Sequence, residues 1–313
     1  MSEAGTPDGG RTSARLTLVL AALLWSSGSL FMRLFTVPTG LGLESPELPP
    51  IQIAFWRGLF AACALLPWIR PASVRFRPIM FAMVVCFAVM CGVYITALGH
   101  GNAANAILLQ NTAPIWVYII GVLFLGHAAE RGNLSATLLA MLGAGVLVLG
   151  NWPWNRSAAE QANDIPLLLM GLASGFTYAG VVLFLGALKG ENPAWLMVLN
   201  LFGSALFLGI YVSCIQTWIE PTPVQFIALF LYGTIQMALP YWLFARGLKY
   251  VSAQEAGIIT LLEPVLNPIW AYLIDPVRDT PTIWTWLGGG ILLAALAWRY
   301  VPRRRISIAG RSR

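Results

Sequence analysis

Charged side chains are scarce in this sequence. Of its 313 residues, 10% are Asp, Glu, Lys or Arg, whereas 58% are hydrophobic and the mean hydropathy is +0.72. A soluble domain of this size cannot bury so large an apolar share, so the composition excludes a soluble globular protein and is typical of a helical membrane protein. The net charge of +6 does not indicate nucleic-acid binding, because the arginines stand at the ends of hydrophobic segments and in the C-terminal tail.

Residues that bind metals or carry covalent chemistry are scarce as well. The two histidines, His100 and His127, are isolated in predicted loops on opposite sides of the membrane. The four cysteines stand in hydrophobic segments at spacings that match no zinc, redox or disulfide pattern. The sequence contains neither a phosphate-binding loop nor a nucleophile with a histidine partner. We therefore predict that the protein is not an enzyme and uses no metal or cofactor.

Ten hydrophobic segments are long enough to cross a bilayer, for which roughly 17 to 25 residues are needed. They cover residues 16–35, 50–68, 78–98, 103–126, 134–151, 165–188, 193–215, 224–246, 252–274 and 282–301. The connections between them are too short for a soluble domain. The predicted fold is all-α, with ten transmembrane helices in an integral membrane protein.

Lys and Arg are distributed very unevenly between the two sides of this predicted bundle. If the N-terminus is cytoplasmic, fifteen of them lie on the cytoplasmic side and only Arg156 and Arg278 lie outside, which predicts that both termini are cytoplasmic. We divide the chain into a disordered N-terminus (1–15), a five-helix repeat (16–151), a connecting loop (152–164), a second five-helix repeat (165–301) and a basic tail (302–313). Because each repeat has an odd number of helices, the two are inverted, an arrangement typical of alternating-access transporters.

Proline interrupts two hydrophobic segments that occupy corresponding places in the two halves. Shifted by 150 residues, the segment 98–116 lies over 248–266, and Pro114 lies over Pro264. Pro264 and the following Pro268 each remove a backbone donor and so free a carbonyl group one turn earlier. A pair of interrupted helices of this kind indicates the substrate site of a transporter.

One acidic residue, Glu263, stands inside the second of these segments. A carboxylate near the centre of a transmembrane helix costs about 2.5 to 3.5 kcal/mol on insertion scales, so Glu263 is expected to face protein or a water-filled cavity. Glu263 and Asn267 are four residues apart and share a helix face, as do Gln110 and Pro114. Two interpretations are open: these residues with Asn111 line a cavity in which Glu263 contacts substrate or binds a coupling proton, or Glu263 only hydrogen-bonds freed backbone groups.

Basic and aromatic residues inside the segments are further candidates. Arg57 could neutralise a substrate carboxylate, pair with Glu263, or bond structurally to helix-end carbonyls, which we favour; Arg33, near its helix end, is expected to snorkel to the surface. Aromatic residues on segments rich in proline or small residues suit a pocket lining. The complete set of predicted pathway residues is Glu263, Asn267, Gln110, Asn111, Trp116, Tyr94, Tyr178, Tyr241, Trp25 and Arg57, with helix breaks at Pro114, Pro264 and Pro268.

Four motifs carry a resemblance to a known family. They are ALLWSSGSLFMR (22–33), FWR (55–57), GNAANAILLQNTAPIW (101–116) and SAQEAGIITLLEPVLNPIW (252–270). In these motifs the chain resembles the drug/metabolite transporter superfamily, specifically its EamA-type ten-span permeases. The resemblance implies a basket of ten helices, a central cavity lined by the first, third, fourth, sixth, eighth and ninth helices, and export or exchange of small metabolites such as amino acids.

The chain departs from the family pattern at two helix ends. The Gly-Glu pair that usually ends the fourth helix is Gly126-His127 here, and the pair after the ninth helix is replaced by Asp275-Pro276. Glu263 and Pro264 are intact.

We therefore predict a permease that moves small organic metabolites across a bacterial inner membrane, outward or in exchange. Its partners are the solute and the lipid bilayer, not nucleic acid. The positive ends of helix dipoles at the interrupted segments suit an anionic group such as a carboxylate. The alternative is a non-transporting membrane scaffold or accessory subunit, in which the polar residues of the interrupted helices would matter only for stability.

Overall fold

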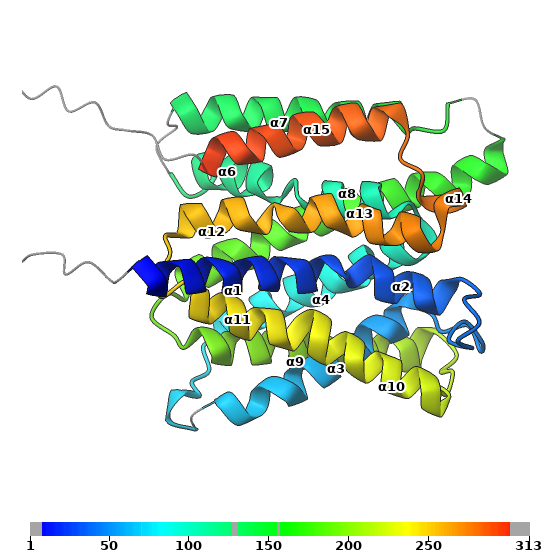
Figure 1. The fold of residues 1–313 in the computed structure, drawn as a ribbon, viewed down its shortest axis with the longest axis horizontal. Helices are drawn as coiled ribbons and strands as arrows, with labels where there is room; N and C mark the ends of the chain where they lie inside the picture. Colours follow the sequence, from blue (N-terminus) through cyan, green and yellow to red (C-terminus); the bar gives the residue numbers. More distant parts are fainter. Residues whose placement is uncertain (1–7, 70, 127–130, 155–156, 301–313) are drawn as a thin grey trace, which may run out of the picture.

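The computed structural model describes residues 8–69, 71–126, 131–154 and 157–300, and its regular elements are helical throughout these ranges. The helices run side by side along one common direction and form a bundle (Figure 1). The predicted basic tail (302–313), His127 and the first seven residues lie outside the described residues. α1 begins at Asp8, inside the N-terminal segment 1–15 for which disorder was predicted.

In the described ranges fifteen α-helices form the bundle, several of them joined end to end into longer segments. In chain order they are α1 (Asp8–Ser26), α2 (Gly28–Thr36), α3 (Pro50–Leu65), α4 (Pro78–His100), α5 (Ala103–Gln110), α6 (Ala113–Leu123), α7 (Arg131–Gly150), α8 (Ala158–Ala187), α9 (Pro193–Ile215), α10 (Pro223–Leu231), α11 (Leu239–Gly247), α12 (Ala253–Thr260), α13 (Leu262–Ile274), α14 (Pro276–Asp279) and α15 (Ile283–Tyr300). A π-helical segment, η3 (Tyr232–Ala238), joins α10 to α11, and two short 3₁₀ turns, η1 (Leu66–Trp68) and η2 (Pro71–Ser73), follow α3.

Eight helical segments of the described chain are long and apolar enough to cross a membrane. They are Thr12–Thr36, Pro50–Trp68, Pro78–His100, Ala103–Leu123, Glu160–Ala187, Pro193–Ile215, Pro223–Gly247 and Glu255–Ile274. Two shorter apolar helices, Leu134–Gly150 and Ile283–Arg299, stand where the fifth and tenth transmembrane helices were predicted. The prediction of an all-helical integral membrane protein is confirmed.

Side-chain caps mark where several of these helices begin. The Asn102 side chain accepts a hydrogen bond from the Asn105 N–H at the start of α5, and Ser252 accepts one from the Glu255 N–H at the start of α12. Asn192 caps α9 in the same way. Each cap satisfies a backbone donor that the first turn of a helix leaves unpaired, so the short polar turns of the sequence fix the helix starts.

Glycine allows a close contact between the helices α7 and α15. A Cβ atom on Gly143 would lie 2.6 Å from the Leu292 backbone nitrogen, and one on Gly288 would lie 2.6 Å from the Leu147 backbone nitrogen. No other residue can occupy these two positions without moving the backbones apart.

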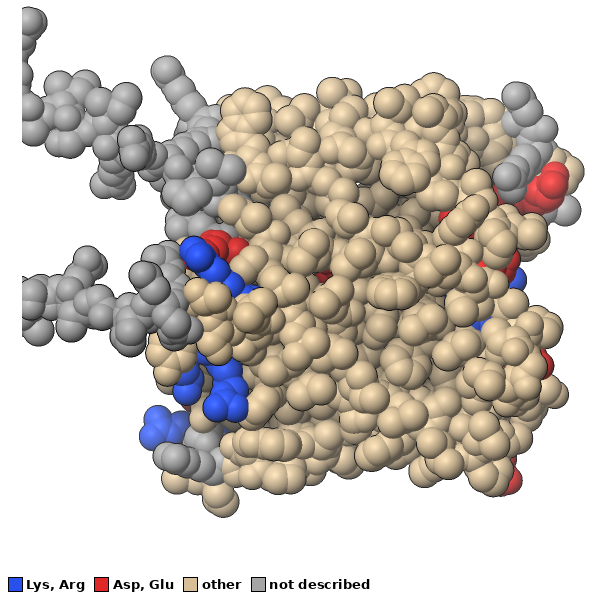
Figure 2. Space-filling model, viewed as in Figure 1, with Lys and Arg blue, Asp and Glu red and all other residues tan. Residues whose placement is uncertain are grey.

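The charged side chains are concentrated at the two ends of the bundle. Figure 2 shows Lys and Arg gathered at the end where α1 begins, whereas Asp and Glu predominate at the opposite end of this face. The band between the two ends is almost free of charge on this face (Figure 2), as expected for a surface in contact with lipid.

Candidate functional site

Four of the long segments are interrupted inside the bundle. α1 gives way to α2 at Ser27, α5 to α6 at residues 111–112, and α12 to α13 at Leu261, while the π-helical segment η3 interrupts the helix formed by α10 and α11. The breaks before α6 and α13 lie close to Pro114 and Pro264, and α13 continues through Pro268. The other two interruptions were not predicted: no proline marks the break at Ser27, and Pro240, in the first turn of α11 just after η3, was not used as a signal.

Arg57 of α3 is the centre of a buried polar cluster beside η3. Its side chain is 4% exposed, and its guanidinium carbon lies 5.1 Å from the centre of the Tyr232 ring. Its Nη1 donates to Gln236 Oε1 at 3.4 Å, but its Nε has no hydrogen-bond partner. One guanidinium donor is therefore left unused in a position closed to bulk water.

Side chains of this cluster also satisfy the backbone at the break between α1 and α2. A break leaves carbonyl groups that a continuous helix would bond. The side-chain bonds at this break are Gln236 Nε2 to the Trp25 carbonyl (3.1 Å), the Tyr232 hydroxyl to the Gly28 carbonyl (3.0 Å) and Trp270 Nε1 to Ser26 Oγ (2.9 Å). The break is thus held by groups from η3 and α13 as well as by its own helix, in which the Ser26 and Ser27 hydroxyls donate to the Leu23 and Leu24 carbonyls.

Asn267 of α13 completes the cluster. The Ser29 hydroxyl donates to its backbone carbonyl at 2.5 Å. Its side chain is 1% exposed, yet neither the amide oxygen nor the amide nitrogen has a partner. Gly28 provides the space beside it, because a Cβ atom there would lie 3.2 Å from Gln236 Nε2 and 3.8 Å from Asn267 Nδ2.

Glu263 lies in the first turn of α13 and is half-buried. It belongs to none of the ion pairs found among the described residues, so the predicted pairing with Arg57 is not formed in this structure. The carboxylate is nonetheless close enough to Arg57, Tyr94 and Tyr241 to interact with them electrostatically.

The predicted aromatic residues divide into two groups. Trp25 and Tyr241 meet edge to face with ring centres 5.1 Å apart, and both belong to segments that build the Arg57 cluster. Tyr94, on α4, is 7% exposed. Tyr178 is 41% exposed on α8 but close enough to Tyr241 to interact with it electrostatically, whereas Trp116 packs its ring against Phe176 of α8 with ring centres 5.5 Å apart.

Gln110, Asn111 and Trp116 all stand at the break between α5 and α6. Asn111 Nδ2 donates to the Ile107 carbonyl of its own helix, and Trp116 Nε1 donates to Thr112 Oγ1 at 3.2 Å. This second break packs against α8. The structure therefore places these three residues around a second helix break, between α5 and α6.

Arg33 does not snorkel to the surface, which corrects the expectation from the sequence. Its side chain is fully buried, with Nε 2.5 Å from Asp279 Oδ2 and Nη2 2.8 Å from Asp279 Oδ1. The guanidinium also donates to the carbonyls of Leu98, Gly99 and Gly101. The Arg33 side chain turns inward because two groups lie within its reach. These are the Asp279 carboxylate of α14 and the carbonyl acceptors at the turn from α4 to α5.

A membrane bundle whose helices break around buried polar side chains has the architecture of a solute transporter. The model of the EamA-like transporter family matches residues 12–149 and again 165–300, so the chain belongs to this family. The family confirms the resemblance that the sequence motifs indicated.

Individual proteins agree with this assignment. The chain is 29% identical to a protein of Archaeoglobus fulgidus described as an uncharacterized transporter, over 90% of this chain and 95% of that protein. It is 24% identical to the pseudopaline exporter CntI of Pseudomonas aeruginosa (83% and 89% covered) and 26% identical to a riboflavin transporter of Brucella anthropi (79% and 87% covered). A crystal structure 15% identical in sequence matches 95% of this chain and 100% of its own chain with a TM-score of 0.62, so the two share a fold. The family and these relatives support membrane transport as the function.

Proposed function

We propose that this protein is a permease that moves small organic metabolites bearing a carboxylate, such as amino acids, across a bacterial cytoplasmic membrane by alternating access. The observation that carries the proposal is the Arg57 cluster, in which Arg57 Nε and both side-chain atoms of Asn267 are buried without a partner. A buried polar group without a hydrogen bond costs about 1 to 3 kcal/mol. A solute that supplies the missing partners removes this cost, which favours binding at this position.

The chemistry of the cluster suits a carboxylate beside an apolar or aromatic group. A guanidinium is planar, and its donors match the two oxygens of a carboxylate. The Asn267 amide can both donate to and accept from a polar substituent. The rings of Trp25, Tyr241 and Tyr94 stand on the neighbouring helices and provide the apolar lining that small-molecule sites require.

Helix packing supports two inverted halves of five helices, with α7 and α15 as the fifth and tenth. α4 packs against α8, and the segments η3 and α11 pack against α1 in the corresponding way. α5 and α6 also pack against α8, as α12 and α13 pack against α1. These pairs are what an approximate two-fold relation between the halves would produce, and the two successive family matches agree with it.

The proposal is tested by transport into proteoliposomes with a panel of radiolabelled amino acids and their decarboxylated amines. In Arg57→Gln, the KM for solutes with a carboxylate should rise at least about tenfold, the loss expected when a charged hydrogen bond is removed. Arg77→Gln is the matched control, because Arg77 is an exposed arginine far from the cluster in sequence, with a side chain 52% exposed. An unchanged KM in Arg57→Gln would contradict contact between Arg57 and substrate.

Energy coupling is assigned to Glu263 in this proposal. It is an acidic side chain close to the cluster and outside the ion pairs of the described residues, so it can exchange a proton without breaking a salt bridge. Glu263→Gln should therefore transport solute at a rate that no longer responds to a pH gradient. If the variant responds as the wild type does, Glu263 is structural. That result would not bear on the proposed carboxylate site at Arg57, which the Arg57→Gln measurement tests independently.

A further inference from the structure

Two membrane-spanning segments end next to each other where α1 begins. The segment Pro223–Gly247 ends with α11, and the segment Pro50–Trp68 ends with the 3₁₀ turn η1. The end of α11 packs on the first turns of α1, because a Cβ atom on Gly247 would lie 3.3 Å from the Ala14 carbonyl oxygen. The Trp242 ring of α11 lies 6.2 Å, centre to centre, from the ring of Trp68, which is 59% exposed. Tryptophan concentrates at the boundary between acyl chains and water, so both segment ends lie at the depth of the lipid headgroups.

Arg246, in the last turn of α11, is exposed at this boundary and is held over an aromatic ring. Its guanidinium carbon lies 4.5 Å from the centre of the Trp242 ring, one turn earlier on the same face of the helix. Stacking uses the face of a guanidinium and leaves the N–H groups on its edges free to donate. The tryptophan therefore fixes the position of the cation without using its hydrogen-bond donors.

The positive charges of Arg246 and Lys249 have no partner in the part of the chain that the structure describes. Neither side chain forms an ion pair or a hydrogen bond there. The Lys249 N–H donates to the Arg246 carbonyl at 3.3 Å, so the two residues lie within one turn of each other. Both are exposed. The end of α11 thus offers two cations at headgroup depth.

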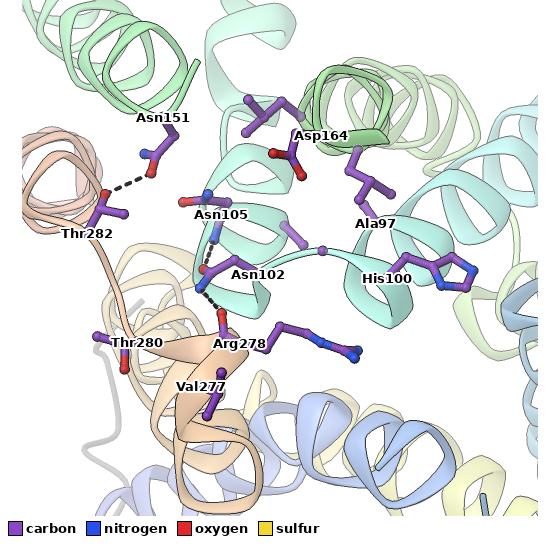
Figure 3. Close-up of a pocket in the computed structure, with 14 residues that line it drawn as sticks. Ala97, His100, Asn102, Asn105, Asn151, Asp164, Val277, Arg278, Thr280 and Thr282 are labelled. Atoms are coloured by element: carbon purple, nitrogen blue, oxygen red, sulfur yellow. Dashed lines mark hydrogen bonds between the residues drawn. The ribbon is translucent and has the colours of Figure 1, made fainter. Parts of the chain in front are cut away.

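Two other arginines show how such a charge is held within this protein. At the same end of the bundle, Arg15 Nε lies 2.5 Å from Glu255 Oε1. At the opposite end, Arg278 lines the polar pocket drawn in Figure 3, and its Nε lies 3.4 Å from Asp275 Oδ2. Arg246 has a ring where these arginines have a carboxylate, so an anion from outside the described chain can complete its environment.

We propose that the end of α11 and the turn η1 form a binding site for the headgroup of an anionic phospholipid, made by Arg246, Lys249, Trp242 and Trp68. The phosphodiester accepts from Arg246, whose fork of donors matches two phosphate oxygens, and from the Lys249 ammonium group. The two tryptophan rings pack against the glycerol and the first carbons of the acyl chains. Basic groups at the ends of membrane-spanning helices bind anionic headgroups in this way.

The charge of the site favours an anionic lipid over a zwitterionic one. Phosphatidylcholine and phosphatidylethanolamine carry a cationic group beside the phosphate. The site consists of two cations and two aromatic rings and contains no carboxylate that would bind this group. Phosphatidylglycerol brings the phosphate without a positive charge, and it is therefore the lipid expected to bind.

The site is tested with the purified full-length protein in phosphatidylcholine nanodiscs that contain increasing fractions of phosphatidylglycerol. Thermal unfolding is followed, because a ligand that binds the folded state raises the unfolding temperature. The unfolding temperature of the wild type should rise to a plateau, and the phosphatidylglycerol fraction at half of this rise measures the apparent affinity. Arg246→Gln and Lys249→Gln should each raise that fraction about fivefold, the effect expected for one basic residue at an anionic surface.

Arg75→Gln is the matched control for Arg246→Gln. Arg75 is also exposed, but it belongs to neither α11 nor η1, and its carbonyl accepts from Trp195 Nε1 at the start of α9. Diffuse attraction by the net charge of this end would be reduced equally in both variants, whereas a defined site is weakened only in Arg246→Gln. Arg246→Lys keeps the charge, loses the planar fork of donors and should weaken binding as well. Equal titrations of the wild type and Arg246→Gln, or equal shifts in Arg246→Gln and Arg75→Gln, would overturn the proposal.

A soluble phosphodiester distinguishes the lipid from a free anion. Glycerophosphoglycerol, the same headgroup without acyl chains, should leave the unfolding temperature unchanged in a neutral, lipid-free detergent. Stabilisation by this compound that Arg246→Gln abolishes would assign the site to a soluble phosphodiester and overturn the lipid proposal. These measurements involve no transport and no residue of the Arg57 cluster. Their failure therefore leaves the proposed permease function untouched, and failure of the transport assay leaves this site untouched.

Discussion

Replacing Asp279 by alanine would leave the Arg33 guanidinium buried without its countercharge. The three carbonyl acceptors at Leu98, Gly99 and Gly101 would remain at 2.7, 3.3 and 2.8 Å. Removal of one partner of a buried ion pair costs about 3 to 5 kcal/mol, because the other charge stays in a medium that solvates it poorly. The Ala103 N–H, which donates to Asp279 Oδ1 at 2.9 Å, would lose its acceptor and add roughly 1 kcal/mol.

The same principle predicts that a double replacement costs less than the sum of its parts. Arg33→Met alone leaves a buried carboxylate and should again cost about 3 to 5 kcal/mol, whereas Arg33→Met with Asp279→Leu leaves no charge behind. We therefore expect a coupling free energy of at least about 2 kcal/mol in a double-mutant cycle for this pair.

Equilibrium unfolding in detergent, followed by tryptophan fluorescence, measures each corner of this cycle. Arg77 and Glu191 provide the control cycle, because their charges are 3.7 Å apart and the arginine side chain is 52% exposed. An exposed pair of this kind should contribute less than about 1 kcal/mol. If the losses in free energy of unfolding for Arg33 and Asp279 were additive, or if the single variants were as stable as the wild type, a poorly solvated ion pair would not be what joins α2 to α14.

Three further predictions follow from other parts of the molecule. In a variant free of native cysteines, Glu220→Cys should react with a membrane-impermeant maleimide in intact cells and Lys189→Cys only after permeabilisation; the reverse pattern would contradict cytoplasmic termini. Gly288→Leu should lower the free energy of unfolding by about 3 kcal/mol or more, because its Cβ would lie 2.6 Å from the Leu147 nitrogen. Gly290→Leu is the control and should be about as stable as the wild type, because the space around its Cβ is open. Equal losses of stability in the two variants would refute the packing argument. Thr285→Val should lower the free energy of unfolding by about 1 to 3 kcal/mol in the same assay. Thr285 is only 4% exposed and forms hydrogen bonds with Asn105 at 2.8 Å and with Asn151 at 3.2 Å, which the valine would lose. Thr280→Val, at an exposed position in the adjoining loop, is its control.

The sequence predicted those features of the bundle that arise from local chemistry. Hydrophobic length predicted the positions of the long segments, and Pro114 and Pro264 indicated two interruptions. Arg57 was identified as deeply placed because it stands well inside a hydrophobic segment. In each case the signal lies within one or two helical turns of the residue concerned.

Features that depend on distant residues could not be predicted in this way. Arg33 and Asp279 are separated by 246 positions, and no sequence pattern indicated that an acidic residue in a short loop would reach an arginine of the first segment. The break at Ser27 is held by Gln236 and Trp270, which belong to the second half of the chain. Only the packed structure brings such partners together, so the residues that hold the Arg57 cluster were missed even though Arg57 itself was found.

The π-helical segment η3 has a consequence for the history of this helix. A π-turn spans one residue more than the α-turn it replaces, so a single inserted residue creates it while α10 and α11 keep their structure. Each residue of an α-helix turns the chain by about 100° around the axis. A deletion within α10 or α11 would therefore rotate the residues that follow by that angle, and Tyr241 and Trp242 would leave Trp25 and Trp68, whose ring centres lie 5.1 and 6.2 Å from theirs. The π-turns of η3 are wound less tightly than α-turns, so removing the extra residue from 233–235 would restore α-turns and leave α11 facing as it does now. The segment η3 is therefore the place in this helix where the chain length can change by one residue without exchanging the side chains that α11 presents to the bundle.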